Sequence, residues 1–455
     1  MDDTRLRVLS LLRRHGWNST SFQVLEEGFQ YAFDDEADAC VAYVQTAGAW
    51  VVAGAPIASS DASGGVVDRF LAKARDAKRR VAFFAVEEPF LRAHRVSSVH
   101  IGEQPTWDPA AWDATVRETR SLREQLRRAR AKGVVVRSVG SDEVTDPAAP
   151  LRRAVDVLIT RWLGSHAMAP MGFLVDVQPF AFPEERRYFV AEKDGRAVAF
   201  LAAVPVYARS GWLLEDLLRD PSAPNGTAEA LVDFAMRAFA RDDSRYVTMG
   251  LAPLAGAKGW LGGAREWARA FYDFDGVRAF KAKLRPQHWD PIYLAYASEA
   301  SVNVALVDAL AAFARGSFAR YGAETLLHGP AIVVRALGAM LVPWTLLLAL
   351  APVRWFPTAS LKVAWVVFDV ALATGLFVLA ARWRWWLGRA LAAAVTIDAA
   401  LTVSEVLAWN LPRAHGVGDW IVAAIACGAP SAAATILWSA LGRRAWMRGE
   451  APMVS

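Results

Sequence analysis

Cysteine is nearly absent from this sequence. Only Cys40 and Cys427 occur among its 455 residues, the first in a polar region and the second inside an apolar run. A disulfide framework and a cysteine-rich metal site are therefore both excluded. The polar part of the chain fits a reducing compartment.

Several catalytic motifs are also missing. The seven histidines are scattered, without an HExxH or similar pair, so the sequence does not predict a metalloenzyme. Neither a GxSxG elbow nor a Walker loop occurs, which leaves serine-hydrolase and P-loop chemistry without support.

Charge of one sign is not in large excess either. The 51 Lys and Arg against 46 Asp and Glu give a net charge of +5, which favours anionic partners such as membrane phosphates or RNA.

Long apolar runs, by contrast, are present from about residue 331. Four stretches are each near the ~20 residues that a helix needs to cross the hydrocarbon core. They cover residues 331–353, 363–381, 387–409 and 420–441. Tryptophans at their edges are typical of an interfacial belt. The sequence therefore predicts a four-helix transmembrane domain at 331–445 and a tail at 446–455.

The charges between these runs predict their orientation. Arginines crowd the second connection and follow the last run, and such basic ends lie in the cytoplasm. They are Arg382, Arg384, Arg389, Arg443, Arg444 and Arg448. The segment Met1–Trp17 is too highly charged for a signal peptide. We therefore expect the first 320 residues and both termini in the cytoplasm.

Three carboxylates interrupt the apolar runs. Asp398 and Glu405 are seven residues apart, on one face of a helix, and Asp369 lies in the preceding run. Carboxylates are costly in a membrane and call for an explanation. Hydrogen bonding between helices, or pairing with Arg335, is the favoured interpretation, and a polar groove for a lipid headgroup is the alternative.

The first 300 residues have the pattern of a mixed α/β protein. Strands are predicted at Ala39–Val44, Ala49–Ala53 and Arg80–Val86, with a helix at Val66–Ala77. The later part contains a hairpin candidate, Tyr188–Val206, around the turn Asp194–Gly195. After it we expect a Pro-rich loop at Asp220–Gly226, a helix at Thr227–Ala240 and a strand at Tyr246–Leu251. These patterns predict two α/β lobes, 1–150 and 151–300, and a linker at 301–330.

A cationic stripe is predicted between the lobes. Arg120, Arg123, Arg127 and Arg130 recur at spacings of three and four in a helix expected to include Arg117 and Lys132. A solvated helix face is the default explanation. The alternative is binding of nucleic-acid phosphates, which would be electrostatic and sensitive to salt.

Two segments resemble the catalytic domain of aminoacyl-phosphatidylglycerol synthases, the lysyltransferases of the multiple peptide resistance factor family. They are Leu214–Gly226, LEDLLRDPSAPNG, and Met249–Leu254, MGLAPL. Further agreement comes from Gly16–Asn18, from Phe271–Lys283, FYDFDGVRAFKAK, and from Pro286, Trp289, Pro291 and Tyr293. The resemblance covers residues 15–297.

The resemblance implies a bacterial inner-membrane enzyme with two tandem lobes of the GNAT (N-acetyltransferase-like) fold. It implies transfer of an aminoacyl group from aminoacyl-tRNA to the glycerol headgroup of phosphatidylglycerol, without a cofactor. Asp216 and Arg219 match its functional Asp-x-x-Arg pair, and Lys281 or Lys283 matches a functional lysine. The ester bond of aminoacyl-tRNA is already activated, so the acceptor hydroxyl needs only positioning, partial deprotonation and charge stabilisation. Asp216 would hold the donor's ammonium, Arg219 a phosphate, and the lysine the developing oxyanion or a proton.

The candidate substrate-binding residues are Glu103, Glu215, Asn225 and Arg278, together with Arg120, Arg123 and Arg127 on the stripe. A solvated loop carboxylate explains Glu103 equally well. A turn and helix cap suffice for Asn225. Asp216 and Arg219 are expected in a loop or helix end outside the core, where the simpler interpretation is a surface ion pair.

The sequence also departs from the family. No large N-terminal flippase precedes the catalytic region, so lipid translocation is not expected. Ala268–Ala270 replaces a Gly-Glu-His, and Gly54–Pro56 replaces a Gly-Asp-Pro, which leaves the amino acid and the lipid open. One alternative is an acyl-CoA-dependent N-acyltransferase, although the nearest phosphate-binding turn, Arg335–Ala339, lies in an apolar run. Another is a non-catalytic module that binds lipid or tRNA. Formation of a homo-oligomer is also left open.

Overall fold

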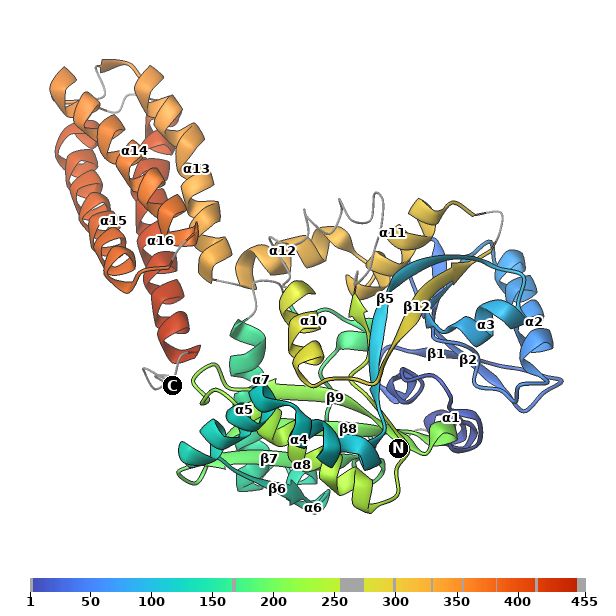
Figure 1. Cartoon of the computed structure of the whole chain (residues 1–455). Helices are drawn as coiled ribbons and strands as arrows, with labels where there is room; N and C mark the ends of the chain where they lie inside the picture. The colour runs from blue at the N-terminus through green and yellow to red at the C-terminus, as the bar shows by residue number, and fades with distance from the viewer. Residues whose placement is uncertain are drawn as a thin grey trace. The chain divides into compact units, whose positions relative to one another are not determined.

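The computed structural model describes residues 3–165, 169–253, 274–297, 300–328, 330–353, 356–381, 383–413 and 416–447. The chain forms two compact units (Figure 1). The first comprises Met1–Trp162 and Pro170–Tyr321, and the second comprises Leu163–Ala169 and Gly322–Ser455.

The first unit is built on one continuous twelve-stranded sheet. Its order is β1-β2-β3-β4-β12-β5-β10-β9-β8-β7-β6, and β11 pairs with β5 beside this path. Pairing is antiparallel except between β3 and β4 and between β9 and β10. The strands are β1 (Gln30–Phe33), β2 (Cys40–Gln45), β3 (Ala49–Ala53), β4 (Arg80–Val86), β5 (Ser97–Trp107), β6 (Val135–Val139), β7 (Arg187–Lys193), β8 (Arg196–Val206), β9 (Gly211–Arg219), β10 (Tyr246–Thr248), β11 (Ala252–Pro253) and β12 (His288–Tyr296).

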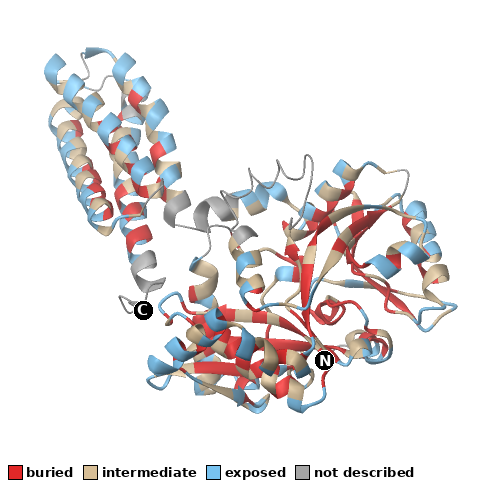
Figure 2. Ribbon diagram, in the orientation of Figure 1, coloured by how far each residue is buried: buried red, intermediate tan, exposed pale blue. Residues whose placement is uncertain are grey.

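Helices cover both faces of this sheet, and the buried residues concentrate on the strands between them (Figure 2). The helices are α1 (Asp3–His15), α2 (Ser63–Asp76), α3 (Glu88–Ala93), α4 (Trp112–Glu118), α5 (Arg120–Ala131), α6 (Asp142–Thr145), α7 (Pro150–Ser165), α8 (Thr227–Arg241), α10 (Phe274–Lys283), α11 (Val302–Phe313) and α12 (Phe318–His328). On the β6–β9 part of the sheet, α5 and α8 pack on one face and α7 on the other.

The sequence patterns predicted several of these elements. The bounds of β3 and β4 and the hairpin of β7 and β8 are as expected, and α8 begins at Thr227. The predicted mixed α/β class followed by long apolar helices is confirmed. Strand β10 is shorter than expected: it ends at Thr248, whereas the predicted strand extended to Leu251.

Strands are shared between the two halves of the sheet. β12, from late in the chain, inserts between β4 and β5, and the far end of β5 pairs with β10. β6 precedes the predicted lobe boundary at residue 150 but pairs with β7. The predicted linker at 301–330 contains α11 and α12, and α11 packs on the sheet through Ala305, Ala309 and Ala312.

In its described residues the second unit contains four long helices, α13 (Pro330–Leu350), α14 (Ala359–Ala381), α15 (Trp385–Glu405) and α16 (Val417–Met447). A π-helical turn, Val406–Asn410, continues α15. All four are long and apolar enough to cross a membrane, with candidate spans at Val333–Leu350, Ala359–Ala380, Trp385–Arg413 and Ala423–Gly442. Four long apolar helices, the number that the sequence predicted, are therefore confirmed among the described residues.

A polar contact inside this unit agrees with the favoured interpretation for one of its three carboxylates, Glu405. The indole of Trp365 on α14 donates to Glu405 on α15 at 3.1 Å, and Thr402 donates to Asp398 at 3.4 Å. Arg335 is exposed on α13 and, among the described residues, forms no ion pair with these carboxylates. Hydrogen bonding between helices thus accounts for Glu405, and pairing with Arg335 does not occur.

Candidate active site

A β-bulge in β9 brings two adjacent carboxylates together. Opposite β8, Ala202 pairs with Asp216 and Ala203 with Leu214, so Glu215 is an extra residue on β9. An extra residue interrupts the alternation of side chains and redirects them locally. Glu215 can therefore accept a hydrogen bond from the guanidinium of Arg186. Asp216 interacts electrostatically with the same guanidinium.

Arg186 is the centre of a buried cluster of charges. Its side chain is 0% exposed, and it lies between a short 3-10 helix, Pro183–Glu185, and β7. Its Nη1 donates to Glu215, and its Nη2 lies 3.3 Å from Oε1 of Glu26. Its Nε donates to the carbonyl of Ala181 at 2.6 Å. A single cation therefore serves three carboxylates, those of Glu26, Glu215 and Asp216.

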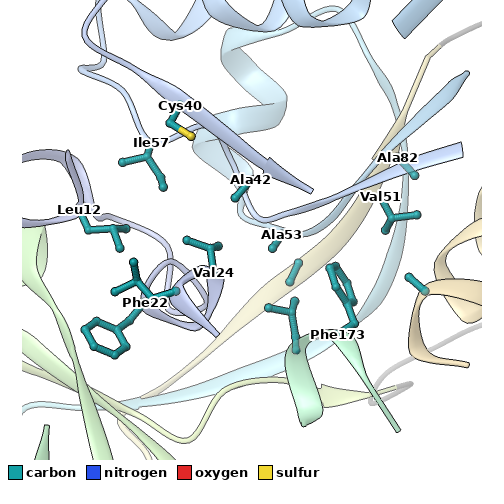
Figure 3. Packing of buried hydrophobic residues seen from close by; sticks show 14 of the residues in the cluster. Leu12, Phe22, Val24, Cys40, Ala42, Val51, Ala53, Ile57, Ala82 and Phe173 are labelled. Carbon is teal, nitrogen blue, oxygen red and sulfur yellow. The ribbon is translucent and has the colours of Figure 1, made fainter. Parts of the chain in front are cut away.

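Hydrophobic packing places Glu26 in this cluster. The turn before it, Phe22–Leu25, is fully buried, and Phe22 and Val24 pack in the core with Leu12 of α1 and Ile57 (Figure 3). The guanidinium of Arg186 lies 5.3 Å from the centre of the Phe22 ring. The buried turn thus fixes the direction of a carboxylate that is 1% exposed.

The cluster has more negative than positive groups. Glu26 Oε2, Glu215 Oε1 and Asp216 Oδ2 are buried without a hydrogen-bond partner. Burial, followed by repulsion from Glu215, raises the pKa of Glu26 and of Asp216 well above the usual range. Buried carboxylates with free oxygens favour the arrival of a cation. Among the described residues no group of side chains fits a metal ion.

The structure corrects the expected location of Asp216 and Arg219. They lie on β9 and not in a loop or helix end, and Asp216 is 6% exposed within the core. Residues three apart on a strand point to opposite faces, so the two form no surface ion pair. Arg219 instead donates to the carbonyl of Ala223 at 2.5 Å. The bulge explains the error, because it breaks the alternation that marks a strand in sequence.

The loop after β9 is built for tight packing against α5. Gly226 has a φ of +93°, and a Cβ there would lie 2.3 Å from the carbonyl of Gln125 on α5. Asp220 forms a buried ion pair with Arg161, with 2.8 Å between Oδ2 and Nη1. Asn225 is exposed in the turn, in keeping with the turn role expected for it. Pro221 and Pro224 have no amide hydrogen, so this loop is a poor cradle for the pyrophosphate of an acyl-CoA.

Lys281 and Lys283 have different environments. Lys281 is 6% exposed, and its Nζ donates to the carbonyls of Met249, Gly250 and Leu251 at 2.9, 3.0 and 2.9 Å. Lys283 is exposed. Burial lowers the pKa of Lys281 to about 7. Near neutral pH it can therefore release a proton, which leaves two N–H donors for three carbonyls.

We expect Lys281→Met to lower the free energy of unfolding by about 2–4 kcal/mol, because it removes the donor of three hydrogen bonds to backbone carbonyls. Lys283→Met, two residues away on the exposed side of α10, is the control and should change it by less than about 0.5 kcal/mol. Thermal unfolding of the full chain in detergent micelles measures both. Equal effects of the two substitutions would contradict a clamping role for Lys281.

Two further candidates meet on the other part of the sheet. Arg278 on α10 pairs with Glu103 at 3.1 Å, and its guanidinium lies 4.7 Å from the centre of the Trp289 ring. Glu103 lies on β5, opposite Pro291 of β12, and is not the loop carboxylate that the simpler interpretation assumed. The structure thus brings these two predicted residues together.

The predicted cationic stripe lies on α5. Leu122, Leu126 and Ala129 are its buried face, and Arg120, Arg123 and Arg127 are exposed. A break at Thr119 separates α5 from α4, so Arg117 belongs to α4. Glu124 pairs with Arg127 and Arg128, which lower its pKa to about 2. The stripe is therefore exposed and keeps an excess of positive charge, which fits both interpretations.

Sequence reasoning missed Glu26 and Arg186. Each has a neighbour of the same type, Glu27 and Arg187, and both neighbours are exposed. No local pattern distinguishes the buried member of either pair from its neighbour. The signal available was indirect: Glu26 follows a segment with three apolar residues, Phe22, Val24 and Leu25.

Comparison with known proteins supports the resemblance. Residues 9–296 match the family described as phosphatidylglycerol lysyltransferase, C-terminal. The chain is 25% identical over 323 residues to the phosphatidylglycerol lysyltransferase of Bacillus subtilis, covering 66% of this chain and 36% of that protein. It is 26% identical over 319 residues to an uncharacterised protein of Corynebacterium glutamicum, covering 64% and 39%. The chain thus spans less than two-fifths of the length of these relatives.

Solved structures show the same fold. A C-terminal domain assigned to a lysylphosphatidylglycerol synthetase of Agrobacterium fabrum superposes with a TM-score of 0.60 at 22% identity, covering 69% of this chain and 98% of that one. L-PGS from Bacillus licheniformis gives 0.59 at 20% identity, covering 69% and 97%. The family match extends over more than half of the sequence and includes β9, Arg186 and Lys281. The chain belongs to the family of phosphatidylglycerol lysyltransferase C-terminal domains.

Proposed function

We propose that the first unit transfers an aminoacyl group from aminoacyl-tRNA to the headgroup of phosphatidylglycerol. The observation that carries this proposal is the buried cluster of Glu26, Glu215 and Asp216, whose three free oxygens call for a cation. Every aminoacyl donor carries an ammonium group. The family to which residues 9–296 belong supplies the lipid acceptor.

The reaction needs little from the protein beyond positioning. The hydroxyl oxygen of the lipid headgroup attacks the ester carbonyl carbon, and the ribose hydroxyl of the tRNA leaves with a proton. The carboxylates hold the donor's ammonium, and its charge compensates theirs. Lys281, with a pKa of about 7, is suited to accept and return a proton. The step is a transesterification, so it requires no cofactor.

Arg219 and the arginines of α5 are suited to bind phosphates. Leu217 packs on the α5 and α8 side of the sheet and Leu218 on the α7 side, so Arg219 faces α5 and α8. The loop after β9 touches α5 at Gly226. Arg219 and the exposed arginines of α5 thus lie on the side of the sheet opposite Asp216, where they would bind the backbone of the long tRNA donor.

The membrane-spanning helices hold this unit at its acceptor. Their connections carry more arginine on one side, which supports a cytoplasmic position for the catalytic unit and for both termini. Aminoacyl-tRNA is available on that side.

Replacing Arg120, Arg123 and Arg127 together with alanine should weaken the use of aminoacyl-tRNA and flatten its salt dependence. Loss of three phosphate contacts is expected to reduce the slope of log KM against log salt by about 2 to 3. The matched control replaces three exposed basic residues of the α2 region, Lys73, Arg75 and Lys78. Transfer assays across a salt series measure the slope. An unchanged slope would show that α5 is only a solvated face.

Ribonuclease treatment tests the donor itself. In membranes that contain the full chain, formation of aminoacylated lipid should stop when tRNA is digested and resume when charged tRNA is added back. If product formation resists ribonuclease and depends on acyl-CoA instead, the aminoacyl-tRNA proposal is wrong.

A further inference from the structure

We propose that the exposed face of α11 docks into the headgroup region of the lipid bilayer. α11 begins at Val302, beyond the part of the chain that matches the family, which ends at residue 296. The proposal concerns where the first unit rests and does not depend on the transfer reaction.

α11 is held firmly to the sheet. Ala305, Ala309 and Ala312 are in the same core as β3 and β4. Asp308 is 6% exposed and pairs with Arg80 of β4 through two hydrogen bonds of 2.8 and 2.7 Å. The helix is thus a fixed part of the first unit, and its outer face has a fixed direction.

That outer face is apolar. Val304, Val307 and Leu310 are 39%, 52% and 56% exposed, and their spacing of three places them along one side of the helix. Phe318, at the start of α12, is 51% exposed. Single exposed aliphatic residues are ordinary on protein surfaces. A row of three on one helix, followed by an exposed phenylalanine, indicates an interaction surface.

The part of the chain that follows α11 indicates that lipid covers this exposed face. Val333 begins the first candidate membrane span, shortly after α12. From Phe318 to the end of α12 the helix rises about 15 Å. The few residues from there to Val333 can add at most about 17 Å. Phe318 therefore lies within roughly 30 Å of the start of the candidate span, which is close enough for the apolar face to reach a lipid surface.

The surface has the character of an interfacial contact. Valine, leucine and phenylalanine side chains on one side of a helix enter the boundary between headgroups and acyl chains, while the helix lies in its plane. Such a contact would hold the catalytic unit at the level of the lipid headgroups, where its acceptor is found.

Spin labelling of the full chain in phosphatidylglycerol-containing nanodiscs tests this docking. A nitroxide is attached at Val307→Cys, in a Cys427→Ala background, while Cys40 is fully buried. The matched control is Val157→Cys on α7, because Val157 is 50% exposed and Val307 is 52% exposed. We expect the label at 307 to be relaxed by oxygen, which dissolves in lipid, and protected from a water-soluble nickel complex. The label at 157 should show the reverse.

Two outcomes overturn the proposal. If the label at 307 is as open to the nickel complex as the label at 157, the face is simply in water. If it is protected from both reagents, protein covers the face, either a second copy or another part of this chain. A Leu310→Glu substitution adds a causal test: it should at least double the nickel accessibility of the label at 307, and no change would contradict lipid contact.

Discussion

Arg186→Met should destabilise the first unit by about 3–5 kcal/mol, which is the usual cost of removing one partner from a buried group of charges. The substitution leaves Glu26, Glu215 and Asp216 buried without their cation. These carboxyls can become neutral only by taking up protons. The loss of stability should therefore be small near pH 5 and grow as the pH rises to 8, because the folded variant must then either hold protons that the unfolded chain releases or bury negative charge.

The control for this prediction is the next residue. Arg187 is 45% exposed and pairs with Asp242 on the surface. Exposed pairs of this kind contribute little, so Arg187→Met should cost less than about 1 kcal/mol at any of these pH values. Denaturant unfolding of both variants in micelles at pH 5 and pH 8 makes the comparison. Similar losses at the two positions would mean that Arg186 does not hold the cluster together.

Glu26→Gln should have two opposite effects: reduced activity and undiminished or increased stability. Burial and repulsion from Glu215 raise the pKa of Glu26 in the folded state. A raised carboxyl pKa means that the folded chain binds the extra proton, so stability falls as the pH rises above the unfolded pKa of about 4.3. Glutamine has a similar shape and no charge. The variant should gain stability relative to the parent as the pH rises towards 8, with little difference near pH 4.

The same variant should lose about tenfold to a hundredfold in kcat/KM for aminoacyl-tRNA. This range corresponds to the loss of one hydrogen bond to a charged group. Glu27→Gln, at the exposed neighbouring position, should alter neither quantity. Gaining stability while losing activity is typical of a site that sacrifices stability for binding. If Glu26→Gln instead unfolds the protein and spares activity in the remaining folded fraction, the cluster is structural.

The periodicity of the sequence predicted the regular elements. The hairpin of β7 and β8 has alternating residues around Asp194–Gly195, and the four apolar helices have the required length, so local patterns were sufficient. Insertion of β12 between β4 and β5 was beyond reach, because no local pattern reports which distant strand will pair. The bulge at Glu215 hid the strand character of β9 for the related reason that it disrupts alternation.

Family motifs carried the prediction of the candidate site. Asp216, Lys281 and Lys283 were proposed through the resemblance, but their different burial was not predicted, and only the structure shows that three carbonyls surround Lys281. Glu26 and Arg186 differ from their neighbours only in tertiary surroundings. Burial of a charge depends on the whole fold, so a short segment of sequence does not reveal it.

The central claim is that the carboxylate cluster on β9 binds the donor of a lipid-directed aminoacyl transfer. The most direct test is mass spectrometry of lipids from a phosphatidylglycerol-containing bacterial host that expresses the full chain, its Asp216→Asn variant or its Arg187→Met variant. At equal abundance in the membrane, the parent and Arg187→Met should produce a new aminoacylated phosphatidylglycerol, and Asp216→Asn should not. An unchanged lipid profile with abundant parent chain, or undiminished product from Asp216→Asn, would contradict the claim.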